Sequence, residues 1–306
     1  MKRLTAALAA ASLLAACATL PTPDAGERLM RDVRVLAADD MGGRATGREG
    51  AAMARVHVLR RFRQAGLRPG PAGWEQPFAF TTKGGDTVHG VNLVGMVRGR
   101  SRPGEFIVVT AHYDHEGVVE GEIYNGADDN ASGVASLFEL ARRLRAKPPE
   151  HSVLFVALDA EEMGLKGAEA FVAEPPVPVA AMRLNINLDM ISRLDTGEIW
   201  AVGTHPYPGL RAPLEAVAAR SKVKLSFGRD RPEDKGRMNW VNLSDQEPFH
   251  RAGVPFVFFS VDDHPDYHRP TDDADRIPVE AYAAAVETIV DAFRTLDAMD
   301  LTGVRR

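Results

Sequence analysis

Short apolar runs that alternate with helical patterns constrain the fold of this chain more than any other feature. Six runs have the length and the flanking Gly, Pro or Asp residues expected of strands, at residues 91–97, 106–110, 152–158, 184–188, 199–202 and 255–261. Helical periodicity covers residues 132–145, 165–172, 210–219 and 279–299. Strands that are apolar throughout, separated by amphipathic helices, predict an α/β fold. We expect a mixed, mostly parallel central sheet with helices on both faces.

The chain has 306 residues, 45% of them hydrophobic and 26% charged, which is an ordinary globular composition. No linker divides it after residue 26, so we predict one domain over residues 26–306 whose helical first part, residues 26–70, packs against the rest. The net charge is −5 and no basic stripe stands out, so the sequence gives no support for a nucleic-acid partner. No pattern in it assigns an oligomeric state.

The first residues have the pattern of an export signal. Two basic residues precede an apolar run over residues 4–16 that is too short to span a bilayer. The run ends in LAAC at Cys17, which resembles the bacterial lipobox, where the cysteine is lipidated. We expect a lipoprotein signal peptide over residues 1–16 and a tether over 17–25, and Ala18 implies the periplasmic side of the outer membrane. The alternative is that Cys17 is an incidental residue of the apolar segment.

Acids and histidines follow four of the predicted strands, where each strand ends. They are His112 and Asp114, then Asp159, Glu161 and Glu162, then Asp189, and finally the acids and histidines of residues 262–268, among them His264 and His268. Ligands of open α/β sheets bind outside the carboxyl ends of the strands, so we expect these side chains to converge. Gathered carboxylates repel one another unless cations lie among them. A single cysteine excludes a thiolate cage, and the remaining His and carboxylate ligands suit divalent zinc, with cobalt or manganese as alternatives in vitro.

Each motif also has a purely structural alternative. His112 and Asp114 fit a metal-bound histidine whose other ring nitrogen donates to a carboxylate, or simply a surface histidine at a strand end. In GADDNASG at residues 126–133, helix capping explains one polar residue but not the acidic pair. Glu161 and Glu162 fit acids of a first helical turn. In a dinuclear site, the same two carboxylates would instead divide the roles of ligand and base.

Five motifs, taken in order, resemble the bacterial zinc aminopeptidases of peptidase family M28. They are AHYDH at 111–115, NGADDNASG at 125–133, ALDAEEMGLKG at 157–167, NLDMIS at 187–192 and DYHRPTDD at 266–273. Further similarity lies in GRATG at 43–47, AGL at 65–67 and SDQEPF at 244–249. The resemblance therefore covers nearly the whole mature chain.

The resemblance implies a set of metal ligands for two Zn²⁺ ions. They are His112, Asp128, Glu162, Asp189 and His268. Asp128 matches the carboxylate that bridges both ions, and the family pattern places a cis peptide bond between it and Asp129. His112 and Asp189 would be the remaining ligands of one ion, and Glu162 and His268 would be those of the other.

Three further residues match catalytic roles. Glu161 matches the general base, and Asp114 the carboxylate behind His112. Tyr267 matches a tyrosine that hydrogen-bonds the oxyanion in some members of the family. His264, four residues upstream of the predicted ligand in the same loop, is a rival that the motif register disfavours.

Two positions depart from the family pattern, and both would alter the rim of the pocket rather than the ligand set. Arg269 follows the ligand histidine where a small or hydroxyl residue is common, and Gln246 stands where many relatives have histidine. The remaining histidines are expected to be structural or exposed: His57, His89, His115, His151, His205 and His250.

The resemblance implies hydrolysis of the first bond of peptides with a free N-terminus, by a zinc-bound hydroxide with Glu161 as base. The nearest alternative is a single-zinc glutaminyl cyclase of the same fold, although His112 with Asp114 favours two metals. Another alternative is a peptidase-like binding domain without catalysis. Such domains typically lack ligands or the base, whereas here every position is filled.

Overall fold

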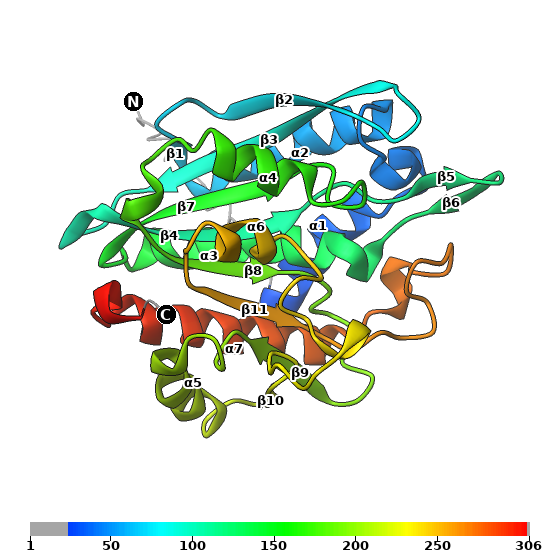
Figure 1. Ribbon diagram of the computed structural model, residues 1–306. Coiled ribbons are helices and arrows are strands. Elements are labelled where there is room, and N and C mark those ends of the chain that lie inside the picture. Colours follow the sequence, from blue (N-terminus) through cyan, green and yellow to red (C-terminus); the bar gives the residue numbers. More distant parts are fainter. Residues whose placement is uncertain (1–23, 305–306) are drawn as a thin grey trace, which may run out of the picture.

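Nine strands form one central sheet in the computed structural model, which describes residues 24–304 (Figure 1). Their order is β1 (Arg68–Pro69), β3 (Thr87–Val97), β7 (His151–Leu158), β4 (Arg102–His112), β8 (Met182–Leu188), β11 (Phe256–Ser260), β9 (Glu198–Val202) and β10 (Lys224–Phe227), with β2 (Glu75–Thr81) paired to β3. A separate hairpin consists of β5 (Gly117–Val119) and β6 (Glu122–Tyr124). The predicted signal peptide and Cys17 lie outside the described residues.

The four central strands β7, β4, β8 and β11 run parallel to one another. Antiparallel neighbours flank them, β3 on one side and β9 on the other, so the sheet is mixed, as predicted. Every residue of β7 is buried, which is typical of a strand covered on both faces. Because the four strands point the same way, their carboxyl ends lie at one edge of the sheet.

Helices cover both faces of this sheet (Figure 1). One face packs against α1 (Ala25–Leu36), α2 (Glu49–Ala65), α3 (Gly133–Ala146), α5 (Arg211–Ala218) and α7 (Val279–Asp297). A smaller apolar cluster on the other face includes α4 (Lys166–Ala173) and α6 (Gln246–Arg251). The four helices predicted after residue 130 are confirmed to within two residues at each end. Within residues 24–304, no helix combines the length and apolar composition that crossing a bilayer requires.

Short and edge elements escaped the sequence pattern. Strand β2 alternates between exposed and half-buried residues and contains Pro77, which suits an edge strand. Strand β10 has four residues and α6 has six, too few for a periodic signal. Helix α1 begins inside the predicted tether, because Asp24 caps it by accepting the backbone N–H of Glu27 at 2.8 Å.

Candidate metal centre

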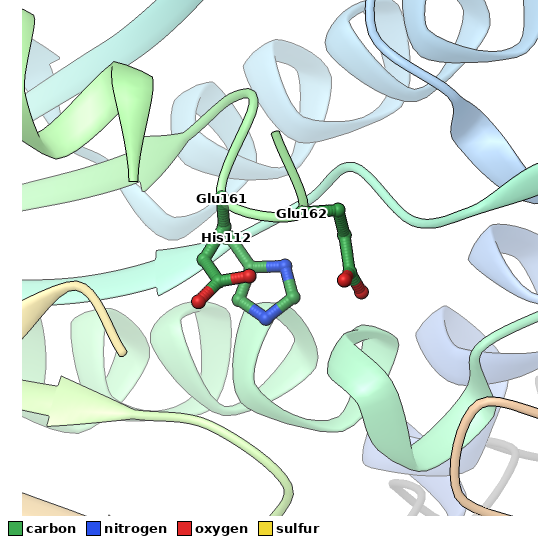
Figure 2. A group of neighbouring side chains, drawn as sticks. All are labelled: His112, Glu161 and Glu162. Carbon is green, nitrogen blue, oxygen red and sulfur yellow. The ribbon is translucent and has the colours of Figure 1, made fainter. Parts of the chain in front are cut away.

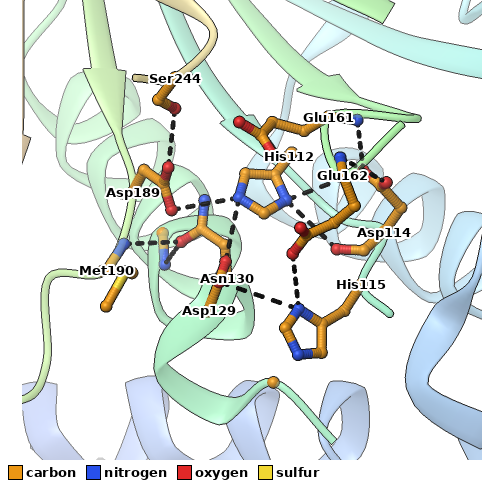
Figure 3. Close-up of polar contacts among 12 residues, drawn as sticks. His112, Asp114, His115, Asp129, Asn130, Glu161, Glu162, Asp189, Met190 and Ser244 are labelled. Carbon is orange, nitrogen blue, oxygen red and sulfur yellow. Dashed lines mark hydrogen bonds and ion pairs between the residues drawn. The ribbon is translucent and has the colours of Figure 1, made fainter. Parts of the chain in front are cut away.

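At the carboxyl edge of the four parallel strands, the predicted acids converge on His112 (Figure 3). His112 is the last residue of β4, and Asp189 directly follows β8. Glu161 and Glu162 follow β7, and their carboxylates flank the His112 ring (Figure 2). His268 lies in the loop after β11. The expectation that these strand ends share one site is therefore confirmed.

Asp129 faces two histidines, one with each of its carboxylate oxygens. Oδ1 of Asp129 lies 3.2 Å from Nε2 of His112, and Oδ2 lies 3.1 Å from Nε2 of His268. Nε2 of His112 also lies 3.1 Å from Oδ1 of Asp189. Nε2 of His268 lies 3.4 Å from Oε2 of Glu162. The Asp129 carboxylate thus lies between two groups of metal donors. One group is His112 with Asp189, and the other is His268 with Glu162.

The structure corrects the predicted register of the acidic pair by one residue. Asp128 is fully buried and points away from His112, because Ser192 donates its hydroxyl and its backbone N–H to Oδ1 at 2.6 and 2.8 Å. Oδ2 of Asp128 lies 3.2 Å from Nε2 of His264, which is therefore not a rival ligand. The cis peptide bond likewise follows Asp129 rather than Asp128.

Burial and neighbouring charges perturb the pKa of Asp129 itself and of both Glu162 and His112 beside it. Burial raises the pKa of Glu162 to about 8, and the charge of Asp129 adds to the effect. Burial would also raise the pKa of Asp129, but hydrogen bonds from the two histidines hold it well below its usual range. Burial would lower the pKa of His112, but the charge of Asp189 and hydrogen bonds to carboxylates raise it well above 6.5. Buried imidazoles and carboxylates that compete for protons are a donor set that fits zinc.

Asp114 supports the centre from behind, although differently from the prediction. Its Oδ1 accepts the backbone N–H of Glu161 at 3.1 Å, and its Oδ2 lies 3.3 Å from the backbone N of Glu162. Nδ1 of His112 lies 3.2 Å from the main-chain oxygen of Asp114 but 3.7 Å from its carboxylate. Asp114 therefore orients the imidazole mainly through its carbonyl and fixes the backbone of both glutamates through its side chain.

Two supporting contacts were missed at the sequence level. His115, expected to be structural or exposed, is buried, and its Nδ1 lies 2.8 Å from Oε1 of Glu162. Burial lowers the pKa of His115 to about 4, so the ring that contacts Glu162 is uncharged at neutral pH. Ser244 donates its hydroxyl to Oδ2 of Asp189 at 2.7 Å. The position of His115 within AHYDH, just past a strand end, was the available signal.

A cavity adjoins the donors on the side of β11. Its walls include the carboxylates of the centre and five apolar side chains, Met190, Trp240, Leu243, Phe258 and Val261. The Glu161 carboxylate borders this cavity and makes no hydrogen bond to any group within residues 24–304. Tyr267 lines it too, with its ring centroid 4.0 Å from that of His268. Burial raises the pKa of Tyr267, so its phenol stays protonated.

Only one of the two departures from the family pattern lies at the surface. Arg269 is exposed. Gln246, expected at the rim, is fully buried and donates its amide N–H to the main-chain oxygen of Trp240 at 2.8 Å. It therefore supports the apolar wall of the cavity from below.

Comparisons with known sequences relate this chain to one peptidase family. Residues 92–293 match the model of peptidase family M28. Aminopeptidase YwaD of Bacillus subtilis is 27% identical over 213 residues, which are 66% of this chain and 43% of that protein. The uncharacterized protein YfbL of Escherichia coli is 29% identical over 217 residues, 61% of this chain and 66% of that protein. The chain thus spans less than two thirds of either relative.

Solved structures share the fold at low sequence identity. The aminopeptidase from Aneurinibacillus sp. strain AM-1 superposes with a TM-score of 0.70 at 17% identity, over 87% of this chain and 92% of that one. Porphyromonas gingivalis glutaminyl cyclase gives 0.72 at 19% identity, over 89% of this chain and 97% of that one. The fold alone therefore does not separate these two activities. The match to the family model extends over more than half of the residues, and this chain belongs to peptidase family M28.

Proposed function

We propose that this chain is a zinc-dependent aminopeptidase that holds two ions. The observation that carries the proposal is the placement of Asp129, whose two oxygens each face a different histidine. His112, Asp129 and Asp189 would hold one ion. Asp129, Glu162 and His268 would hold the other. When bound, zinc supplies a Lewis acid that polarises the scissile carbonyl and lowers the pKa of the attacking water.

Glu161 is the proposed general base. Its carboxylate borders the cavity, makes no hydrogen bond within the described chain, and is held in place through Asp114. It takes a proton from the attacking water and returns it to the leaving amine. Tyr267, which is protonated and lines the same cavity, donates a hydrogen bond to the developing oxyanion.

The cavity supports a substrate whose first side chain is apolar. Its lining includes aromatic groups such as Trp240 and Phe258 beside the acids of the centre, and also the charged side chains of Arg237, Asp262 and Asp263. An apolar side chain against the aromatic groups gains from desolvation, and the free α-amine of the same residue is attracted to the acids of the centre. A blocked amine loses the second interaction, which is why we propose exopeptidase action.

A panel of aminoacyl p-nitroanilides tests this activity. We expect Leu, Met and Phe substrates to be cleaved faster than Glu or Gly substrates, N-acetylated versions to be cleaved far more slowly, and a chelator to abolish cleavage. Equal cleavage of blocked and free substrates would refute the aminopeptidase assignment while leaving a hydrolase. Absence of any chelator-sensitive cleavage across the panel would refute both.

A single-zinc glutaminyl cyclase is the second candidate, because such enzymes share the fold. The contact of His112 with both Asp129 and Asp189 favours a second ion, since it completes another donor group. Native mass spectrometry of the zinc-loaded protein distinguishes the two by counting ions per chain. Incubation with a glutaminyl peptide adds a second criterion, since a cyclase releases ammonia from it without cleaving a peptide bond.

We further propose that the chain is exported and anchored to the cell envelope through a lipid on Cys17. The basic start, the apolar run and the LAAC sequence support this, with the periplasmic side of the outer membrane as the destination. Metabolic labelling with an alkyne fatty acid should mark the wild-type chain but not Cys17→Ser. Equal labelling of both would refute the anchor.

A further inference from the structure

Arg44 is a fully buried arginine that binds only main-chain oxygens. Its guanidinium donates at 2.6–2.9 Å to four carbonyls, those of Leu36, Tyr113, Asn125 and Gly126. Among the described residues, no carboxylate forms an ion pair with it. Burial of a cation costs free energy, which the charge-assisted hydrogen bonds of the guanidinium offset. A buried arginine that binds only carbonyls therefore needs a structural explanation.

Two of the segments that Arg44 binds carry donors of the metal centre. Tyr113 lies between His112 and Asp114, and Gly126 precedes Asp129 by three residues. The planar guanidinium therefore joins the end of β4 to the loop that presents the bridging carboxylate. Its donors have a fixed relative geometry, which a flexible ammonium lacks.

The turn before Arg44 is built to bring it there. Gly42, Gly43 and Arg44 have φ values of 51°, 64° and 54°, all in the left-handed region. A Cβ atom on Gly43 would lie only 2.4 Å from the main-chain oxygen of Tyr124 and 2.5 Å from that of Gly117. Glycine at this position thus lets the turn press against the β5–β6 hairpin. This accounts for Gly43 and Arg44 of the GRATG motif, whose Thr46 instead donates its hydroxyl to Asp159 at 2.8 Å and lies 3.4 Å from Oδ2 of Asp114.

The charge of Arg44 suits its surroundings. Burial lowers the pKa of Arg44 to about 10, while the carboxylates of Asp129, Asp114 and Asp272 oppose that shift. The guanidinium therefore remains positive at neutral pH. A fixed positive charge behind the acids reduces their mutual repulsion when no metal is bound.

We infer that Arg44 is a positioning residue, which sets the spacing between the His112 segment and the Asp129 segment before zinc binds. The inference rests on the metal centre proposed above. Arg44 touches neither donor side chain, and it acts by fixing the backbone from which both extend. When the donors are already held in place, ion binding does not have to offset the conformational entropy that is lost as the loops become ordered.

Zinc affinity of an Arg44 variant is the first test. Arg44→Lys keeps the charge but loses the planar set of donors, and we expect chelator competition to show zinc binding roughly 10–100-fold weaker than wild type. At saturating zinc, kcat should recover more than zinc affinity does. Arg294→Lys is the matched control, because Arg294 also donates to carbonyls, those of Arg143 and Lys147, far along the sheet from the centre. Wild-type zinc affinity in Arg44→Lys would overturn the inference.

Hydrogen–deuterium exchange of metal-free wild-type protein is the second test and needs no variant to fold. We expect the amides of residues 112–114 and 126–130 to exchange slowly before zinc is added. Rapid exchange there, in a protein whose α3 amides remain protected, would overturn the inference. If the wild type binds no zinc at all, the proposed function fails instead, and the exchange pattern still reports whether these segments are ordered without zinc.

Discussion

Oδ1 of Asp114 accepts the backbone N–H of Glu161 at 3.1 Å, so the loop after β4 holds the proposed base that follows β7. The two residues come from neighbouring parallel strands. Their contact fixes the backbone at Glu161, while its carboxylate borders the cavity and has no hydrogen-bond partner within residues 24–304. The role of this free carboxylate is directly testable.

Glu161→Gln should lower kcat by roughly 10²–10⁴, the usual range for loss of a general base. Zinc content should stay at the wild-type value, because neither histidine of the centre depends on this side chain for its place. Steady-state kinetics and metal analysis check the two outcomes. Glu169→Gln, on the exposed side of α4, serves as a control that keeps full activity. Activity of Glu161→Gln within a few-fold of wild type would contradict the role.

Asp128 and Asp129 should respond in opposite ways to the same substitution. Asp129→Asn replaces one of the two facing oxygens by an amide, and zinc affinity should fall by more than about 100-fold, beyond the range for a merely supporting residue. Asp128→Asn weakens contacts to Ser192 and His264 and should instead lower the free energy of unfolding by about 1–3 kcal/mol. Chelator competition and denaturant titration measure the pair, and the reverse pattern would restore the register predicted from sequence.

Metal removal should reduce stability as well as activity. Because only the folded chain gathers the donors, zinc at 100 times its dissociation constant should add about 2.7 kcal/mol to the free energy of unfolding for each ion bound. Thermal unfolding with chelator, and again after zinc is restored, measures this gain. Asp129→Asn is the control and should gain little. A melting temperature that zinc leaves unchanged in the wild type would argue against a buried centre.

Glu139 predicts a pH dependence far from the centre. Burial would raise its pKa, but hydrogen bonds from Arg142, Arg28 and Arg143 hold it at about 2. Between pH 4.5 and 2, Glu139 is protonated in the unfolded chain but still ionised in the folded chain. Its contribution to the free energy of unfolding is therefore complete above pH 4.5 and is lost as the pH falls towards 2. Glu139→Gln should therefore flatten the stability curve of metal-free protein between pH 5 and 2. The exposed Glu215→Gln should leave it unchanged, and equal slopes in wild type and Glu139→Gln would contradict the prediction.

The sequence was sufficient for the central architecture because fully buried strands and amphipathic helices leave strong periodic patterns. The strands ending at His112 and Leu158 and the helix that begins at Gly133 follow this rule. Strand β2, at the sheet edge, has half of its residues in solvent, so its pattern is weak. Strand β2 is held in the sheet by its antiparallel pairing with β3, and the local sequence does not specify that pairing.

The site was predictable in composition but not in the orientation of adjacent side chains. Asp128 and Asp129 are chemically identical, and which of them faces His112 depends on backbone angles and on the distant Ser192. His115 and Arg44 were missed as functional residues for a related reason. Each acts through contacts with chain segments brought close only by folding.

The donors of the centre are spread between positions 112 and 268, and they come from the ends of four strands and from the segment before α3. No contiguous fragment of the chain holds more than a few of these donors. High-affinity binding of an ion therefore requires that the four parallel strands have already paired. We therefore expect zinc to bind after folding rather than to nucleate it. The rate of zinc binding during refolding would accordingly report the rate at which the central sheet forms.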